Sequence, residues 1–288
     1  MSRIKSCFRS RFPSGVLLEV DFSQLEVVGV ALLSRDPVLK DDIRSGRDMH
    51  RRRAAQLFGI SEAAVTKDQR QIAKVLSFQL QYGAGAKSMA AKNGIAEALA
   101  SKFIKLYYDR YVSLQAWQND NIKTVAASRV ATKDRTKLGE PRGKGLLVTD
   151  TGRMYTFMEE DTPEWMRKPR SWGLPAVTVS FSPTQIKNYP SQGFATGDVM
   201  ALFRAMLMEH YRRVPTAWDV GIPVMTIHDS VMFDCVDSIG AKAVNEMCKE
   251  LADSLPSKIE SLWGIRCDLP FKVEGKCGET WADMKPLS

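Results

Sequence analysis

Two short apolar runs in this sequence each lead into an aspartate. The run 16–20 ends at Asp21, and the run 222–227 ends at a His-Asp-Ser turn that contains Asp229. Both runs are rich in β-formers, which predicts buried strands that carry a carboxylate to an exposed end. Taken singly, each aspartate would be a solvated strand end. Brought together, the two could hold a pair of hard cations, as phosphoryl-transfer sites do.

Capping residues, glycines and apolar periodicity predict a largely helical middle and a mixed C-terminal part. The composition turns to Pro, Gly and charge between 128 and 190, which predicts loops around one hairpin. The expected helices begin at Ser23, run from Asp36-Pro37 to Gly46, from Asp48 to Phe58 and from Thr66 or Asp68 to Tyr82, and cover 95–110, 114–127, 193–213 and 239–255; the expected strands are 16–20, 146–149, 154–157, 222–227, 231–236 and 271–274.

A stripe of cationic and aromatic side chains marks the helix expected to end at Tyr82. Arg70, Lys74, Phe78 and Tyr82 are spaced by four, which puts them on one side of an α-helix. Cations followed by aromatics suit a ligand that is anionic at one end and planar at the other, as a nucleoside triphosphate is. The alternative is a partly buried helix whose long cations reach solvent. The residues expected to face the core are Ile72, Val75, Leu76 and Leu80.

Composition narrows the class of protein. The chain has 288 residues and a net charge of +8, which favours polyanionic partners. Arg51, Arg52 and Arg53 form one basic cluster, which could also be a solvated face. Five scattered cysteines without a CxxC pair predict reduced thiols and no zinc site. Without a signal-type or membrane-spanning apolar stretch, the expected location is the cytoplasm.

Five sequence blocks carry a family resemblance. They are DFSQLE at 21–26, DMH at 48–50, an RxxxKxxxFxxxYG pattern at 70–83, SQG at 191–193 and HDS at 228–230. Their order and intervals resemble family A DNA polymerases, the group of bacterial DNA polymerase I-like enzymes and many phage replicases. The closing EGKCGETW also resembles the C-terminal end of that family, so the resemblance covers nearly the whole chain.

The resemblance implies a fold and an activity. The fold would be α+β: a right-hand polymerase palm, built as an antiparallel sheet with helices, plus mainly helical fingers, with thumb and exonuclease absent. Residues 1–34 would form the first part of the palm, 35–127 the fingers and 128–288 the second part of the palm. The activity would be template-directed addition of dNTPs to a primer 3′-hydroxyl with two Mg²⁺ ions, so primer-template DNA and dNTPs would be the partners.

The resemblance also implies residue roles, carried over position by position. Asp21, Asp229 and the backbone carbonyl of Phe22 would hold both metal ions. Lys74 would join the two aspartates in catalysis by giving a proton to pyrophosphate. Glu26 would block a ribose 2′-hydroxyl. The nucleotide-binding set would be Arg70, Lys74, Phe78, Tyr82, His50, Gln24 and Glu26, and the DNA-binding set Gln192, Asn188 and His228.

Three features depart from the family pattern. Ser230 stands where the usual His-Asp-Glu motif has its acid, which removes a second charge near the metals. Gln79 replaces a small glycine. About twenty residues precede Asp21, where the family has its thumb and exonuclease. We therefore expect a split phage-type replicase whose second polypeptide supplies those parts.

Three other functions compete with this interpretation. A single-subunit RNA polymerase shares the right hand and both aspartates, but an acidic Glu26 beside the sugar argues against ribonucleotides. A catalytically impaired, polymerase-derived DNA-binding accessory subunit would explain Ser230, but it has no need of the phosphate-binding stripe. A generic nucleotide-binding α/β protein explains the strands but not the ordered blocks.

Overall fold

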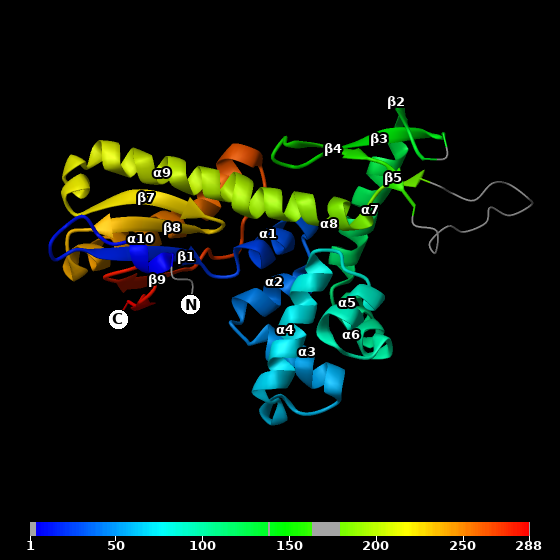
Figure 1. The fold of residues 1–288 in the computed structure, drawn as a ribbon, viewed down its shortest axis with the longest axis horizontal. Helices are drawn as coiled ribbons and strands as arrows, with labels where there is room; N and C mark the ends of the chain where they lie inside the picture. The colour runs from blue at the N-terminus through cyan, green and yellow to red at the C-terminus, as the bar shows by residue number, and fades with distance from the viewer. Residues whose placement is uncertain (1–3, 138, 163–178, 288) are drawn as a thin grey trace, which may run out of the picture. The chain divides into compact units, whose positions relative to one another are not determined.

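The computed structural model describes residues 4–137, 139–162 and 179–287 (Figure 1). Contacts divide the chain into two compact units, unit 1 with Met1–Leu32 and Gln192–Ser288, and unit 2 with Leu33–Ser191. Residues 128–191 therefore pack with the helical middle of the chain. The expected assignment of palm and fingers stays a prediction, since packing alone does not test function.

Unit 1 is built on a five-stranded antiparallel sheet in the order β10-β9-β1-β8-β7. Its central strand, β1, comes from the start of the chain, and its neighbours come from the C-terminal half. Apolar and polar residues alternate along β1, which is typical of a strand with one face buried. The strands are β1 Val16–Phe22, β7 Gly221–Ile227, β8 Ser230–Cys235, β9 Val273–Gly278 and β10 Lys285–Pro286.

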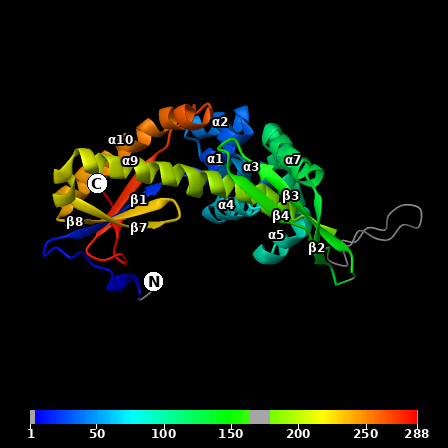
Figure 2. The same cartoon turned by 90° about the horizontal axis from the view of Figure 1, so that it is seen from above.

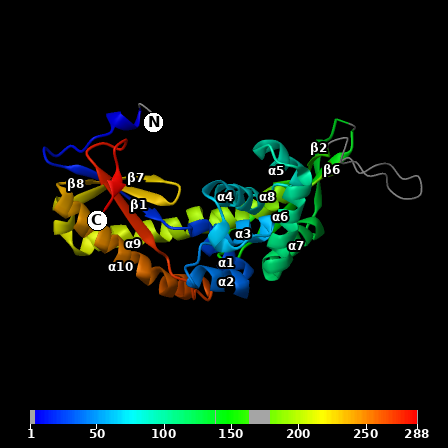
Figure 3. The same ribbon diagram turned by 90° about the horizontal axis from the view of Figure 1, so that it is seen from below.

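Two long helices, α9 (Met200–Arg213) and α10 (Ser238–Trp263), complete unit 1, together with most of α1 (Leu25–Ser34). Figure 2 and Figure 3 show α10 running along one side of β1, and α10 contacts β1, β8 and β9. Leu18, Val20 and Phe22 are buried on that side, whereas Asp21 alternates with them and points to the other. The helix layer thus leaves one face of the sheet for polar side chains.

Three boundaries in unit 1 differ from expectation. Gly193 does not open a helix: helix α8 (Pro183–Gln192) begins ten residues earlier and leads into α9 through a π-helical stretch, Gly193–Val199. Helix α10 continues beyond Pro256, because the buried side chain of Ile259 anchors its last turns. The strand expected at 271–274 is β9, which is displaced toward the C-terminus, and β10 follows it.

Unit 2 is mainly helical. The helices are α2 Pro37–Arg44, α3 Met49–Phe58, α4 Lys67–Gln81, α5 Ala86–Asn93, α6 Glu97–Arg110, α7 Val112–Ala127 and α8 up to Ser191. Side chains of Asp36, Asp48 and Thr66 cap α2, α3 and α4, as the sequence predicts, and Thr66 forms a full capping box with Gln69. Helix α5 was not expected, since it is a short segment between Gly85 and Gly94.

A three-stranded sheet, β2-β3-β4, packs against α7 in unit 2. Its strands are β2 Val130–Arg135, β3 Pro141–Val148 and β4 Met154–Met158, and a two-stranded ladder joins β5 Glu160–Asp161 to β6 Val179–Ser180. The predicted hairpin over 146–157 is confirmed as β3 and β4. Strand β2 was not predicted, because its residues are mostly polar and exposed. The expected loop with Trp165 and Trp172 lies outside the described residues.

The basic cluster Arg51–Arg53 is bound by the protein's own groups. Arg51 donates to the carbonyl oxygens of Glu62 and Val65, and Arg52 pairs with the buried carboxylate of Asp42 at 2.7 Å. Arg53 is itself buried, where it bonds Ser77 and stacks on aromatic rings. These cations hold α2, α3 and α4 together, so the cluster is structural.

Among the described residues, no helix combines the length and apolar character needed to cross a membrane. The five cysteines are unpaired, and Cys235, Cys248 and Cys267 are buried.

Gly83, directly after α4, is constrained both by its backbone conformation and by a close neighbour in unit 2. Its φ is +78°, and an added Cβ would lie 2.7 Å from the Cα of Thr184 in α8. We expect Gly83→Ala to lower the free energy of unfolding by about 2–4 kcal/mol, because positive φ and overpacking add. The matched control is Gly46→Ala, at φ +62° with open space around it, which should cost about 1 kcal/mol. Equal losses in urea denaturation would contradict a close Gly83–Thr184 contact.

Candidate active site

The two aspartates expected to meet lie on neighbouring strands of unit 1. Strand β1 pairs with β8 so that Asp21 stands opposite Ser230, the residue after Asp229. The backbone amide of Phe22 donates a hydrogen bond to the carbonyl oxygen of Asp229 at 3.0 Å. Residues about two hundred positions apart are therefore held side by side by the strand ladder itself.

Unusual backbone conformations flank both aspartates. His228 and Asp229 form the two-residue turn between β7 and β8, and His228 has a φ of +52°. Gln24, in the turn between β1 and α1, has a φ of +59°. Non-glycine residues rarely adopt this region, and the described residues contain one further example, Arg35. Such conformations persist where the surrounding structure determines them, and they concentrate at functional sites.

The surroundings of Asp21 oppose its charge. Burial, and then the nearby carboxylates of Asp229, Glu19 and Glu274, together raise the pKa of Asp21 to about 6, against an opposite effect of Lys276. Like charges placed together in this way resemble a cation site, because a bound cation would favour both charged forms.

Phe22 and Ser230 fill the space between the aspartates and the core. The Phe22 ring is buried on the helix side, 4.9 Å from the ring of Phe203, so only its backbone carbonyl remains available to a metal ion. The Ser230 side chain is buried, and its hydroxyl donates to the carbonyl oxygen of Ile227 at 3.0 Å. Position 230 therefore provides no charge.

The other predicted residues of unit 1 lie near strand and helix ends. Gln24 and His228 are exposed in the two turns, and Glu26 lies in the first turn of α1. Gln192 is the last residue of α8, one turn after Asn188 in unit 2, so the same side of that helix carries both amides.

In unit 2 the predicted stripe runs along α4. Arg70, Lys74, Phe78 and Tyr82 are all partly exposed, with the Lys74 ammonium 5.9 Å from the centre of the Phe78 ring. The buried side of the helix consists of Ala73, Leu76, Ser77, Leu80 and Gln81. Ile72 and Val75, expected in the core, are only partly buried, because they lie at the margin of that side.

Asp48 fixes the cationic end of the stripe. Its carboxylate caps α3 by accepting from the amides of His50 and Arg51, and it also accepts from the guanidinium of Arg70 at 2.6 Å. One side chain therefore sets the start of α3 and the direction of Arg70 on α4.

His50 lies among cations. Its ring is 5.9 Å from that of Phe78, and its Nδ1 is buried without a hydrogen-bond partner among the described residues. Burial, then Arg53, Arg70 and Lys74, lower the pKa of His50 to about 4, against a smaller opposite effect of Asp48. His50 is therefore neutral at pH 7. The surrounding cations would attract an anion placed beside it.

Gln79, the residue that replaced a family glycine, has a structural role. Its side-chain oxygen accepts a hydrogen bond from Asn93 at 2.8 Å, which joins α4 to the end of α5. At the end of α4, the hydroxyl of Thr184 donates to the carbonyl oxygen of Gly83 at 3.1 Å.

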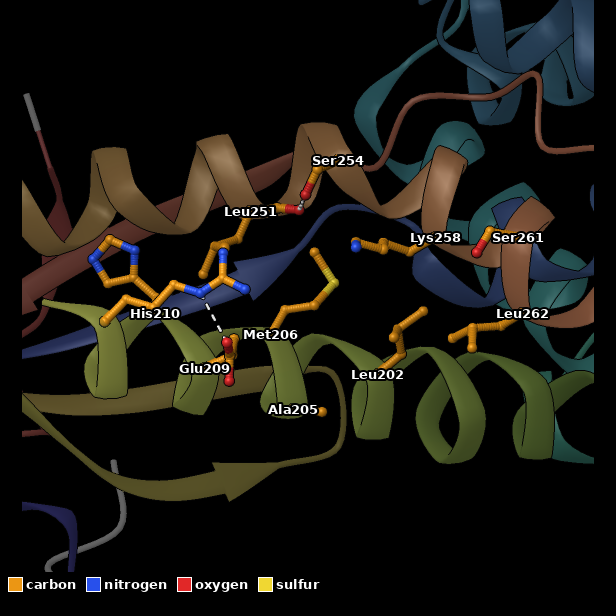
Figure 4. Close-up of a pocket in the computed structure, with 11 residues that line it drawn as sticks. Leu202, Ala205, Met206, Glu209, His210, Leu251, Ser254, Lys258, Ser261 and Leu262 are labelled. Carbon is orange, nitrogen blue, oxygen red and sulfur yellow. Dashed lines mark hydrogen bonds and ion pairs between the residues drawn. The ribbon is translucent and has the colours of Figure 1, made fainter.

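A large cavity of unit 1 lies away from these residues. It measures about 480 Å³ and opens between α9 and α10, with Leu202, Met206 and Leu251 among its apolar lining and Glu209 and Lys258 among its charged lining (Figure 4). None of the predicted site residues lines it. The candidate site of unit 1 is an open sheet face.

Comparisons with known proteins agree with the geometry. The family model described as DNA polymerase family A matches residues 1–139. DNA polymerase I of Deinococcus radiodurans is 35% identical over 270 residues, covering 93% of this chain, and the DNA polymerase of Bacillus phage SP01 is 26% identical over 289 residues, covering 97%. Over nearly its whole length the chain is thus similar to a fragment of a family A DNA polymerase.

The fold is similar to that of family A polymerases. A solved structure of the POL domain of Pol1 from M. smegmatis, in complex with DNA primer-template and dNTP, superposes with a TM-score of 0.65 at 19% identity, over 98% of this chain and 42% of that chain. This likeness supports the expected α+β palm and fingers portion. The chain spans 24% of the Deinococcus enzyme and 27% of the phage enzyme.

The donor set around Asp21 and Asp229 suits Mg²⁺. The described residues contain no group of three or more His, Cys, Asp or Glu side chains able to hold a metal ion. Mg²⁺ is commonly bound by one or two carboxylates, with substrate phosphates and water filling the other positions. Asp21, Asp229 and the Phe22 carbonyl provide such a partial oxygen shell, and the raised pKa of Asp21 shows that burial and like charges outweigh the opposite effect of Lys276.

Four charged residues near the candidate sites were not predicted. Glu19, Glu274 and Lys276 face Asp21, and Asp48 binds Arg70. Glu19 could have been found, because residues two apart on a strand share a face. The two residues of β9 could not, since their register against β1 is set by tertiary pairing.

Replacing Asp21 tests the electrostatics of the site. A folded pKa of about 6, above the unfolded value near 3.8, means that the folded state binds protons more tightly, so this contribution to stability is present at pH 4 and lost as the pH rises through 6. We expect Asp21→Asn, without divalent cations, to raise the free energy of unfolding by about 1–2 kcal/mol at pH 7.5 and by little at pH 4. The control is Asp253→Asn, at an exposed position of α10, which should change stability by less than about 0.5 kcal/mol at either pH. A loss of stability for Asp21→Asn at pH 7.5 would contradict the like-charge interpretation.

Proposed function

We propose that this chain is the nucleotide-adding part of a template-directed DNA polymerase, which joins dNTPs to a primer 3′-hydroxyl by two-Mg²⁺ phosphoryl transfer. The observation that carries the proposal is the β1–β8 pairing, which holds Asp21 beside Asp229. The similarity to family A DNA polymerases supports the class of reaction.

The aspartates would act as the cation-binding groups. Asp21 and Asp229 hold both ions with the Phe22 carbonyl, and the primer 3′-hydroxyl lies at this end of the sheet. When bound, the two ions supply the charge that activates the attacking hydroxyl and stabilises the departing pyrophosphate. The strand ladder keeps the carboxylates in place before substrate arrives, which avoids reorganisation during the reaction.

The α4 stripe would bind the triphosphate. Arg70, oriented by Asp48, and Lys74 contact the β- and γ-phosphates, and His50 adds a ring nitrogen at the same end. Lys74 also gives a proton to the leaving pyrophosphate. Phe78 packs on the sugar and base of the incoming nucleotide.

The remaining residues would select the sugar and read the DNA. Glu26 excludes a 2′-hydroxyl, with Gln24 next to it and Tyr82 at the template side of the new pair. Asn188, Gln192 and His228 contact template, minor-groove edges and the primer end, where hydrogen-bond acceptors are common to all correct pairs.

A second polypeptide that carries thumb and exonuclease is part of the proposal. Affinity purification of this chain from its native source tests it. Recovery of processive primer extension without any associated chain would contradict it.

A catalytically impaired DNA-binding subunit is the second candidate, because the uncharged Ser230 side chain occupies the turn. An RNA polymerase is the third, and a preference for NTPs over dNTPs in primer extension would favour it. The substitutions below separate the first two candidates.

Removing either aspartate should abolish nucleotide addition. In primer extension with Mg²⁺, with the proposed partner present, we expect Asp21→Asn and Asp229→Asn to lower the rate of incorporation by about 10³-fold or more, since each removes a cation-binding charge. Primer-template affinity should fall by less than about threefold. Unchanged incorporation by both variants would favour the accessory subunit.

Lys74 should affect the chemical step. Lys74→Ala is expected to lower kcat for incorporation by about 10²-fold, the usual contribution of a positioned proton donor. The control on the same helix is Lys67→Ala, at the exposed first residue of α4, which should leave kcat within about twofold. Similar effects of the two substitutions would point to general electrostatics in place of a proton donor.

A further inference from the structure

We propose that the carboxylate of Glu19 is a positioning group for the Asp21–Asp229 pair, and that it replaces, from the neighbouring strand, the acid missing at position 230. This inference rests on the proposed function, since it concerns the same cation site. Glu19 carries no role in the family resemblance.

Glu19 lies on the polar face of β1. It precedes Asp21 by two residues, so both side chains leave the same face of the sheet, about 7 Å apart along the strand. Its partners across the ladders are Met232 on β8 and Lys276 on β9. Glu19 therefore occupies the row next to the row of Asp21 and Ser230.

Ser230 connects the two rows. Its hydroxyl oxygen lies 3.5 Å from a carboxylate oxygen of Glu19 and 3.0 Å from the carbonyl oxygen of Ile227. A hydroxyl has one proton and can rotate, so Ser230 can donate to either acceptor. A glutamate at position 230 would extend from the same buried point toward this face. The Glu19 carboxylate reaches the side chain at 230 from β1.

The charges on this face form a compensated set. The carboxylates of Glu19, Asp229 and Glu274 disfavour the negative charge on Asp21. The ammonium of Lys276 has the opposite effect and favours that charge. Since no three carboxylates of the described residues form a metal-binding group, Glu19 acts at a distance and not as a direct ligand. At this range a charge on a partly buried sheet face changes the affinity for a divalent cation several-fold.

The test measures Mn²⁺ affinity by the loss of the free-ion EPR signal, using the purified chain. We expect Glu19→Gln to weaken Mn²⁺ binding by about 3–10-fold. Adding Ser230→Glu to that variant should restore the affinity to within about twofold of the original, because the charge returns on the facing strand. The matched control is Glu279→Gln, an exposed acid just beyond β9, which should change affinity by less than about twofold.

Each outcome decides the inference. Equal effects of Glu19→Gln and Glu279→Gln would overturn it, as would a failure of Ser230→Glu to restore affinity. If Glu19→Gln does not fold, Glu19→Asp carries the test, with an expected loss of about 2–5-fold. Asp229→Asn distinguishes a failure of the cation site from a failure of the role given to Glu19. If this variant also leaves Mn²⁺ affinity unchanged, or if the unaltered chain binds no Mn²⁺, the cation site of the proposed function is rejected. If Asp229→Asn weakens Mn²⁺ binding and Glu19→Gln does not, only the role of Glu19 is rejected.

Discussion

The pairing of β1 with β8 is the interaction on which the candidate site of unit 1 depends. It brings together carboxylates that repel each other, at a position where burial already disfavours charge on Asp21. The opposing forces are local and identifiable: the hydrogen bond from Phe22 to Asp229, the buried Phe22 ring against Phe203, and the turn conformation of His228. Rigid backbone contacts thus hold side chains that would separate if they were free, which is the arrangement expected of a site prepared for a cation.

A comparable arrangement holds the α4 stripe. Asp48 is at once the N-cap of α3 and the ion-pair partner of Arg70, so the fold of unit 2 and the direction of a candidate phosphate ligand depend on one carboxylate. His50, next in the same turn, is kept neutral by burial and by cations that would attract a triphosphate. We predict that the α4 stripe and the two aspartates act on one nucleotide. This prediction rests on the resemblance to family A polymerases and on the chemistry of the stripe and of the carboxylates.

The sequence revealed those elements whose signals are local. The caps Asp36, Asp48 and Thr66, and the run of β-formers in β1, were recognisable because capping and β-propensity act within a few residues. Features set by tertiary contacts were missed: the start of α8 at Pro183, the extension of α10 past Pro256, and the polar strand β2. The same distinction between local and tertiary signals applies to the site. The sequence suggested that Asp21 and Asp229 could meet but could not show it, and the position of Lys276 follows only from the β1–β9 register.

The raised pKa of Asp21 has a consequence for how such a chain changes over generations. A descendant that only held DNA would gain stability by exchanging Asp21 for a neutral residue, so drift would soon remove it. The turn between β7 and β8 carries the uncharged Ser230, yet Asp21, Asp229 and Glu19 keep their carboxylates together in spite of the repulsion. That cost is of the kind that a bound cation would offset.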